Sequence, residues 1–188
     1  MERENQRVAI SKQMMKGGLL RLLQEKDLEQ INISELCRAA GVNRATFYRH
    51  YDSPREVVLD IAMDMYRDMQ RTVKIPANLA EGESFLEALC DYFYRRRKLI
   101  KILIRCNTDE DLARIIRDFG NAFWEARDEV RELQGMDKDS VRLAVTYLGY
   151  GGYYLLRQWI MEDIPKSSKE IARLIQRILT SPIGRDQQ

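Results

Sequence analysis

The sequence has few of the residues on which enzymes and disulfide-bonded scaffolds depend. Its 188 residues include one histidine, three cysteines and four prolines. The cysteines, at positions 37, 90 and 106, are odd in number and too far apart to indicate a disulfide framework or a zinc site. No cysteine has a base nearby in the sequence, and no glycine-rich phosphate loop follows a strand. We therefore expect no enzyme, no metal and no cofactor, and a reducing, cytoplasmic location.

Long apolar runs and a strong net charge are missing as well. No run approaches the roughly 18 apolar residues that a membrane helix needs, so we expect a soluble protein without a membrane partner. The net charge of +2 excludes a histone-like polycation, and any contact with nucleic acid must come from a local basic patch. The hydrophobic content of 45% is enough to bury a core.

Apolar residues recur at helical spacing along nearly the whole chain, and no stretch alternates as a strand does. The predicted fold class is therefore all-α, with about nine helices. We expect an N-terminal region at residues 1–52, a connecting helix within 53–76 and a helical remainder at 77–188. The last boundary is set by Ile75 and Pro76, because a proline and the residue before it interrupt a helix.

Residues 33–51 carry the pattern of two short helices joined by a tight turn. Ser34 is placed to cap the first helix, and Gly41 stands where the chain must enter the left-handed region to reverse. The second helix is expected to begin near Asn43, with Phe47 buried beneath it. This is a helix-turn-helix, whose second helix suits the major groove of DNA. The side chains expected on its exposed, mostly polar face are Arg44, Ala45, Thr46, Tyr48, Arg49 and His50.

Residues 5–65 resemble the N-terminal domain of the TetR family of bacterial transcriptional regulators. The matching features are a small polar residue opening the first helix, Ala-Gly-Val at the turn, Thr-Phe-Tyr in the second helix, and His-Tyr then Ser before a long helix. The alternative is an ordinary helical hairpin, but the polar face and the aromatic-basic tail argue against it. The resemblance implies a three-helix DNA-binding domain joined by a long fourth helix to a ligand-sensing and dimerisation domain. Its partner would be palindromic, double-stranded operator DNA.

The resemblance also implies roles for single residues at the DNA. Tyr48 and His50 would hold phosphates, while Arg44 and Thr46 would reach base edges. Family members often offer a lysine to a phosphate from the first turn of the fourth helix, and here Pro54 occupies that place. The expected DNA-binding set, with Arg55 as a replacement for the missing lysine, is Ser34, Asn43, Arg44, Ala45, Thr46, Tyr48, Arg49, His50 and Arg55.

Two further polar patterns favour ordinary solvated helix faces. Lys12 and Lys16 share one face of the first helix, where phosphate contact is the alternative. Asp60, Asp64 and Asp68 form a row at intervals of four on the connecting helix, where metal binding is the alternative. We predict that both faces are exposed to water.

One short recognition helix makes too few contacts for specific binding, so the chain is expected to form a homodimer. The resemblance places the interface on the last two helices, near residues 140–162 and 168–180; the alternative is that their apolar stripes close the subunit's own core. Each glycine inside a helix costs roughly 0.5–1 kcal/mol, which indicates that the Gly149 to Gly152 stretch permits close packing, a kink or a ligand. The predicted interface is Leu148, Gly149, Gly152, Leu155, Leu156, Trp159, Ile171, Leu174, Ile175 and Ile178.

A small-molecule effector is implied by the resemblance alone. Its predicted pocket is formed by aromatic residues, although such stripes are more often core: Tyr92, Phe93, Phe119, Phe123, Trp124, Tyr147 and Tyr150. Repression is the commoner mode of action. An activator, or a helical protein-interaction module without an effector, is the alternative.

Overall fold

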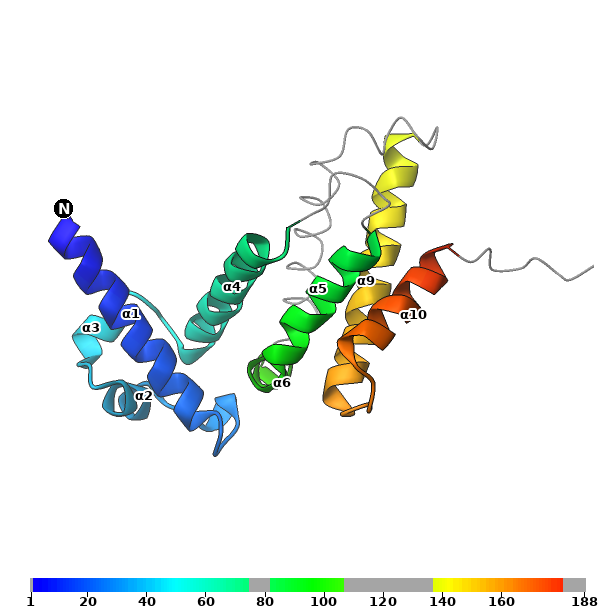
Figure 1. Ribbon diagram of the computed structural model, residues 1–188. Helices are drawn as coiled ribbons and strands as arrows, with labels where there is room; N and C mark the ends of the chain where they lie inside the picture. The colour runs from blue at the N-terminus through cyan, green and yellow to red at the C-terminus, as the bar shows by residue number, and fades with distance from the viewer. Residues whose placement is uncertain (1, 75–81, 107–136, 181–188) are drawn as a thin grey trace, which may run out of the picture. The chain divides into compact units, whose positions relative to one another are not determined.

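The computed structural model describes residues 2–74, 82–106 and 137–180 (Figure 1). Every regular element in these ranges is a helix, which confirms the predicted all-α class. The elements are α1 (Glu2–Leu22), the 3-10 helix η1 (Leu28–Gln30), α2 (Ile33–Ala40), α3 (Arg44–Tyr48), α4 (Pro54–Thr72), α5 (Gly82–Arg95), α6 (Arg97–Cys106), α9 (Lys138–Met161) and α10 (Ser168–Thr180). The helix predicted between residues 109 and 135 lies outside the described residues.

The chain divides into two compact units. The first comprises residues 1–68 and 102–107, and the second comprises 69–101 and 108–188. Both α4 and α6 contribute residues to each unit. The functional division at residues 52 and 76 stays a prediction.

In the first unit, α1 packs on α2 at very short range. A Cβ added to Gly18 would lie 2.8 Å from the backbone nitrogen of Ala40, closer than real Cβ atoms approach. The contact therefore needs glycine at position 18. Buried apolar side chains of the two helices, and of the residue that follows α1, complete this core, namely Met15, Leu19, Leu23, Leu36 and Ala40.

The helix-turn-helix is confirmed, with one change at its start. The side chain of Asn32, not that of Ser34, caps α2, because Asn32 Oδ1 accepts the Glu35 N–H at 2.9 Å. Ser34 lies exposed in the first turn. Gly41 ends α2 in the left-handed region with φ 66°, as predicted. Asn43 caps α3 by accepting the Thr46 N–H at 2.7 Å, at the point where the second helix was expected to begin.

The long fourth helix begins as its sequence indicates. Pro54 is its first residue, where no backbone hydrogen bond is lost, and Ser53 Oγ accepts the Glu56 N–H at 3.3 Å. The helix ends at Thr72, within the predicted range of 53–76. Its buried side chains in the first unit are Val57, Val58, Ile61 and Ala62.

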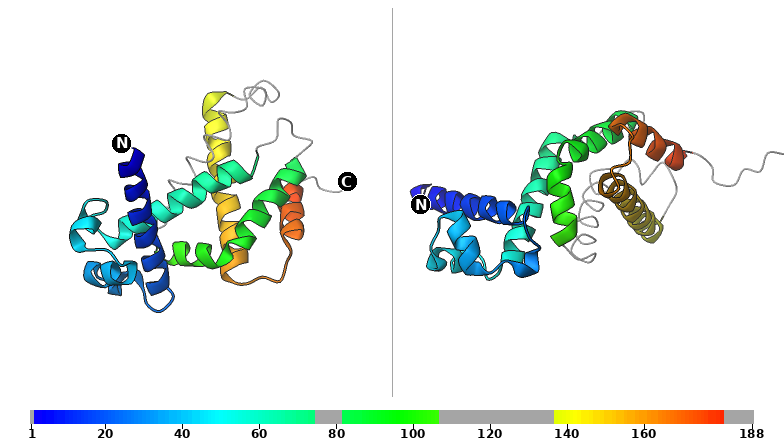
Figure 2. Two further views of the ribbon diagram at one scale, coloured as in Figure 1. Left: turned by 60° about the vertical axis from the view of Figure 1, so that its left-hand side comes forward. Right: turned by 90° about the horizontal axis from the view of Figure 1, so that it is seen from below.

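In the second unit, α5 lies beside α10 (Figures 1 and 2). Tyr94 of α5 stacks on Trp159 of α9 with ring centroids 5.3 Å apart, and Trp159 Nε1 donates to the Lys166 carbonyl at 3.0 Å. Ser167 Oγ accepts the Glu170 N–H at 3.3 Å at the start of α10. The turn between α9 and α10 is thus fixed by side chains. None of the described helices is both long and apolar enough to cross a membrane.

Candidate nucleic-acid interface

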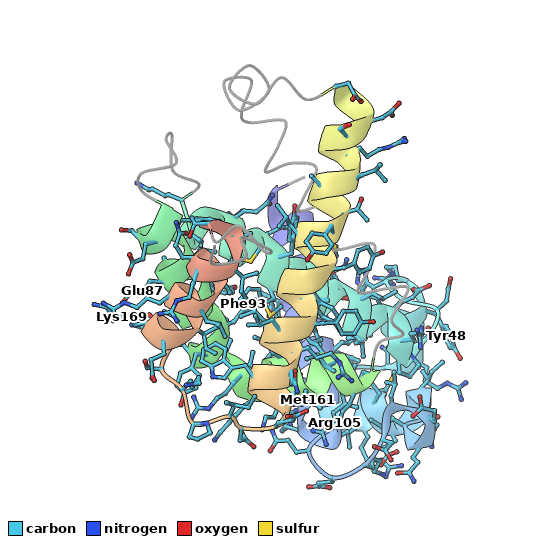
Figure 3. The ribbon with its side chains drawn as sticks, turned by 90° about the vertical axis from the view of Figure 1, so that its right-hand side faces the viewer. Tyr48, Glu87, Phe93, Arg105, Met161 and Lys169 are labelled. Carbon is cyan, nitrogen blue, oxygen red and sulfur yellow. The ribbon has the colours of Figure 1, made fainter. Side chains whose placement is uncertain are left out.

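The predicted DNA-reading residues surround one buried anchor on α3. Phe47 is fully buried, while Asn43, Arg44, Ala45 and Arg49 are exposed and Thr46 and His50 are half-buried. Tyr48 keeps 47% of its surface exposed and lies at the outer edge of its unit (Figure 3). One short helix therefore offers a mixed set of donors to solvent while its aromatic anchor faces the core.

Arg44 and Tyr48 contact each other in the free protein. Arg44 Nη2 donates to the Tyr48 hydroxyl at 3.3 Å, and its guanidinium lies 5.8 Å from the centre of the Tyr48 ring. Residues four apart on a helix are neighbours, so this pair follows from their spacing. A change at Tyr48 will therefore also alter the resting position of Arg44, and the two predicted roles separate less cleanly than the sequence indicated.

His50 has an environment that opposes its charged form. Burial lowers its pKa, and the positive charges of Lys12 and Arg49 lower it further. The imidazole is therefore neutral at physiological pH in the free protein. A phosphate brought beside it would favour the protonated form.

The lysines of α1 meet the aspartates of α4, contrary to the prediction of two solvated faces. Lys16 Nζ lies 3.0 Å from Asp60 Oδ2 and 2.5 Å from Asp64 Oδ2, and its side chain is only 8% exposed. Lys12 Nζ lies 3.4 Å from Asp60 Oδ2, and the Tyr51 hydroxyl donates to the same oxygen at 2.6 Å. Helical spacing showed which residues share each face. It could not show that the lysine face of α1 packs against the aspartate face of α4.

Asp60 stays ionised within this cluster. Burial alone would raise its pKa, but hydrogen bonds from Tyr51 and Lys16, with the charges of Lys16 and Lys12, lower it to about 2. Burial and the bond to Asp60 raise the pKa of Tyr51, so the hydroxyl keeps its proton. Across the part of the chain that the structure describes, no group of three or more potential ligands is placed to hold a metal.

Arg55 lies in the first turn of α4. It is half-buried, and its charge is among those that act on the Cys106 thiol. Burial raises the pKa of that thiol, while Arg105 and Arg55 oppose the rise. Nothing in this arrangement favours Arg55 as the replacement for the phosphate contact missing at Pro54.

The predicted effector pocket is only partly described. Phe119, Phe123 and Trp124 lie outside the described residues. Tyr92 is buried edge-on to Phe93 with ring centroids 5.8 Å apart, and Figure 3 shows Phe93 on the α5 side of α9. Tyr147 is 69% exposed and Tyr150 is half-buried. The described aromatics thus do not share one kind of environment.

A separate groove of about 440 Å³ lies where α9 turns into α10. Tyr94, Trp159 and Pro165 line it together with charged Arg97 and Asp163. None of the predicted pocket residues borders it. Pro165 marks this turn in the sequence. Nothing in the sequence indicated that Pro165 and Tyr94 line the same groove.

The predicted interface residues fall into two groups. Trp159 and Ile171 are buried within the single chain, at 2% and 3% exposure. The other eight are half-buried or exposed, namely Leu148, Gly149, Gly152, Leu155, Leu156, Leu174, Ile175 and Ile178. A Cβ added at Gly151 or Gly152 would meet no described atom within 4 Å. Among the described residues, no close contact accounts for these two glycines.

A capped recognition helix with an exposed polar face, braced by α1, α2 and α4, defines a helix-turn-helix regulator. Family models match both the N-terminal and the C-terminal part of the sequence. Residues 18–61 match the model described as bacterial regulatory proteins, tetR family. Residues 81–181 match one described as a transcriptional regulator C-terminal region. The chain belongs to the TetR family of DNA-binding transcriptional regulators.

Solved structures share the fold at low sequence identity. A TetR transcriptional regulator from Streptococcus agalactiae is 17% identical, with a TM-score of 0.67 over 94% of this chain and 97% of its own. The fatty acid degradation regulator FadR from Bacillus halodurans is 18% identical, with a TM-score of 0.65 over 93% and 97%. PfmR from Thermus thermophilus is 19% identical, with a TM-score of 0.54 over 92% and 99%. No curated protein matches the chain.

Proposed function

We propose that the protein is a cytoplasmic homodimer that binds a palindromic operator through α3 and is modulated by a small molecule. The observation that carries the proposal is the arrangement of α3 itself. Its N-terminus is capped by Asn43, Phe47 is buried, and Arg44 and Tyr48 are exposed. Cationic and hydroxyl donors on one exposed helix face suit the acceptors of the major groove and the phosphates beside it.

Arg44 is the proposed base-reading residue, because a guanidinium can donate two hydrogen bonds to one guanine. Thr46 lies two positions on and is half-buried, so its reach is shorter. Tyr48 and His50 are proposed to hold phosphates, with Arg49 adding charge. Ser34, Asn43 and Ala45 lie exposed beside them, while Arg55 has the weakest support of the set.

Dimerisation is proposed through the exposed apolar side chains of α9 and α10. Leu148, Leu174 and Ile178 are exposed in the single chain although large and apolar, and such surfaces mark interaction sites when they are contiguous. Gly151 and Gly152 leave open space on α9, which a partner helix can enter. Trp159 and Ile171 would support this surface from within.

Control by a small molecule is the least supported part. The helices α4 and α6 each belong partly to both units, which supplies a covalent route for coupling. Coupling of about 1–3 kcal/mol between effector and operator would be typical, and it must be reciprocal. Repression is the expected outcome; activation, or a protein-interaction module without an effector, is the alternative.

Selection from a pool of random duplexes by the full chain tests the proposal. We expect enrichment of a two-fold symmetric sequence. We also expect the logarithm of affinity to fall with the logarithm of salt concentration by about 0.9 per phosphate contacted. A chain that enriches no sequence and binds DNA without salt dependence would favour the interaction module instead.

A further inference from the structure

The segment that follows the recognition helix is tied to the rest of its unit by one carboxylate. Tyr51 comes three residues after Tyr48, and its hydroxyl donates to Asp60 Oδ2 of α4 at 2.6 Å. The same oxygen lies 3.0 Å from Lys16 Nζ of α1. Asp60 therefore joins α1, α4 and the end of the recognition segment at a single point.

This cluster is costly to bury and is not needed for packing. Lys16 is the one charged residue of buried class among those the structure describes. Apolar residues of similar volume often replace buried ion pairs without loss of stability, and phenylalanine would fill the place of the Tyr51 ring. What an apolar set cannot supply is a directional bond that fixes one orientation of the segment.

The recognition helix has little means of orienting itself. It is five residues long, and so short a helix is marginal without tertiary support. The ring of Tyr51 lies 6.0 Å from that of Phe47, the buried anchor of α3. His50 directly precedes Tyr51. Fixing the Tyr51 hydroxyl to α4 therefore fixes both the anchor of α3 and the residue proposed to hold a phosphate.

We propose that Tyr51 and Asp60, supported by Lys16, are positioning residues that hold α3 and His50 in the orientation required for reading DNA. In this role the three act through Phe47 and His50 and not through contacts of their own with DNA. The inference rests on the proposed DNA-binding function.

The test uses the full chain with Tyr51→Phe, which removes one oxygen and keeps the ring. Tyr94→Phe, in the second unit, is the matched control. Two readouts are needed: amide hydrogen exchange of the free protein, and affinity for both a duplex selected by the wild-type chain and a random duplex of equal length. Exchange reports local opening independently of DNA.

In Tyr51→Phe, exchange at the α3 amides should accelerate about tenfold while α10 amides do not change. Affinity for the selected duplex should fall about tenfold, and affinity for the random duplex clearly less, because base contacts depend on orientation more than phosphate contacts do. Tyr51→Phe combined with Asp60→Asn should cost less than the sum of the two single changes, since both break the bond between Tyr51 and Asp60. Tyr94→Phe should match the wild type in both readouts.

Unchanged α3 exchange and an unchanged ratio of the two affinities would overturn the inference. So would equal losses on both duplexes that follow global unfolding, because these indicate a purely structural role. A wild-type chain that binds no duplex would contradict the proposed function instead, and the exchange rates would still decide whether the cluster holds α3.

Discussion

The two units differ in how their polar groups are paired and how their apolar side chains are buried. In the first, Asn32 and Asn43 cap the helix ends, and Lys16 forms ion pairs with both Asp60 and Asp64. In the second, large apolar side chains stay exposed on α9 and α10, and glycines face open space. A unit whose groups are satisfied within the chain can present a defined face to DNA. Exposed apolar side chains mark interaction sites when they are contiguous, which supports the dimerisation proposed through α9 and α10.

The largest effect on this difference is expected from a substitution that fills the open space on α9. Gly152→Leu should overpack a helix seam by roughly 1–3 kcal/mol or more per protomer, and a two-fold interface carries the change twice. The proposed dimer should dissociate in sedimentation while helicity stays near that of the wild type, because a Cβ at position 152 meets no described atom within 4 Å.

Gly152→Ala is the control for this change, since it adds one methyl group and improves helix propensity. It should stay dimeric. A dimer that is unchanged with leucine at position 152 would remove Gly152 from the interface.

The matching change in the first unit is Gly18→Ala. The added Cβ would meet backbone atoms of Ala40 at under 3 Å, so α1 and α2 must separate. We expect a loss of about 1–3 kcal/mol in unfolding free energy, measured by chemical denaturation.

Gly17→Ala is the neighbouring control. Its Cβ would lie 3.7 Å from Arg21 Nη1, an ordinary contact, and removing a helical glycine should add about 0.5–1 kcal/mol of stability. Equal effects at positions 17 and 18 would contradict the close approach of α1 and α2.

Arg44→Ala separates base recognition from phosphate binding on the proposed DNA-binding surface. If Arg44 grips a guanine, affinity for the selected duplex should fall by about 1–3 kcal/mol and preference at one base pair should relax. Tyr48→Phe should weaken selected and random duplexes alike, with a smaller added effect through Arg44. A uniform loss on all sequences for Arg44→Ala would end its base-reading role.

Acid should weaken the first unit through Asp60. Its folded pKa of about 2 is below the ordinary value of 3.8, so its contribution to stability is complete above that value. It is lost as the pH falls from about 4 towards 2, and of order 1–2 kcal/mol is at stake. Asp60→Asn should be less stable than the wild type at pH 7, and the two should converge near pH 2. A constant difference across that range would contradict the assignment.

The smallest effect concerns His50. Its pKa is lowered in the free protein and a phosphate would raise it, so DNA binding should take up a proton. Affinity should rise severalfold as the pH falls from 8 to 6, and His50→Gln should remove most of this change. An equal pH dependence in both proteins would place the proton elsewhere.

Local signals in the sequence predicted the fold of the first unit well. Gly41 was assigned correctly because left-handed turns have a strong preference for glycine, and the second helix begins beside Asn43 as expected. Ser34 was wrongly taken as a cap because Asn32, two residues earlier, carries the same chemistry. These features depend on neighbours in the chain, which a sequence displays directly.

Contacts between distant segments could not be predicted in the same way. Lys16 meets Asp60 and Asp64 across 44 and 48 positions, and Gly18 meets Ala40. Helical spacing gives the face on which each residue lies, but not what covers that face. For the same reason the sequence indicated neither the groove beside Trp159 nor the burial of that residue within the subunit.

The most direct test of the whole account compares a selected palindromic duplex with one in which a single half-site is scrambled. If the first unit reads DNA and the second pairs two copies, scrambling should reduce affinity at least about 100-fold, since each half-site supplies several base contacts worth about 1–3 kcal/mol each. Equal affinity for the two duplexes would contradict the account, because it would mean that one recognition helix suffices.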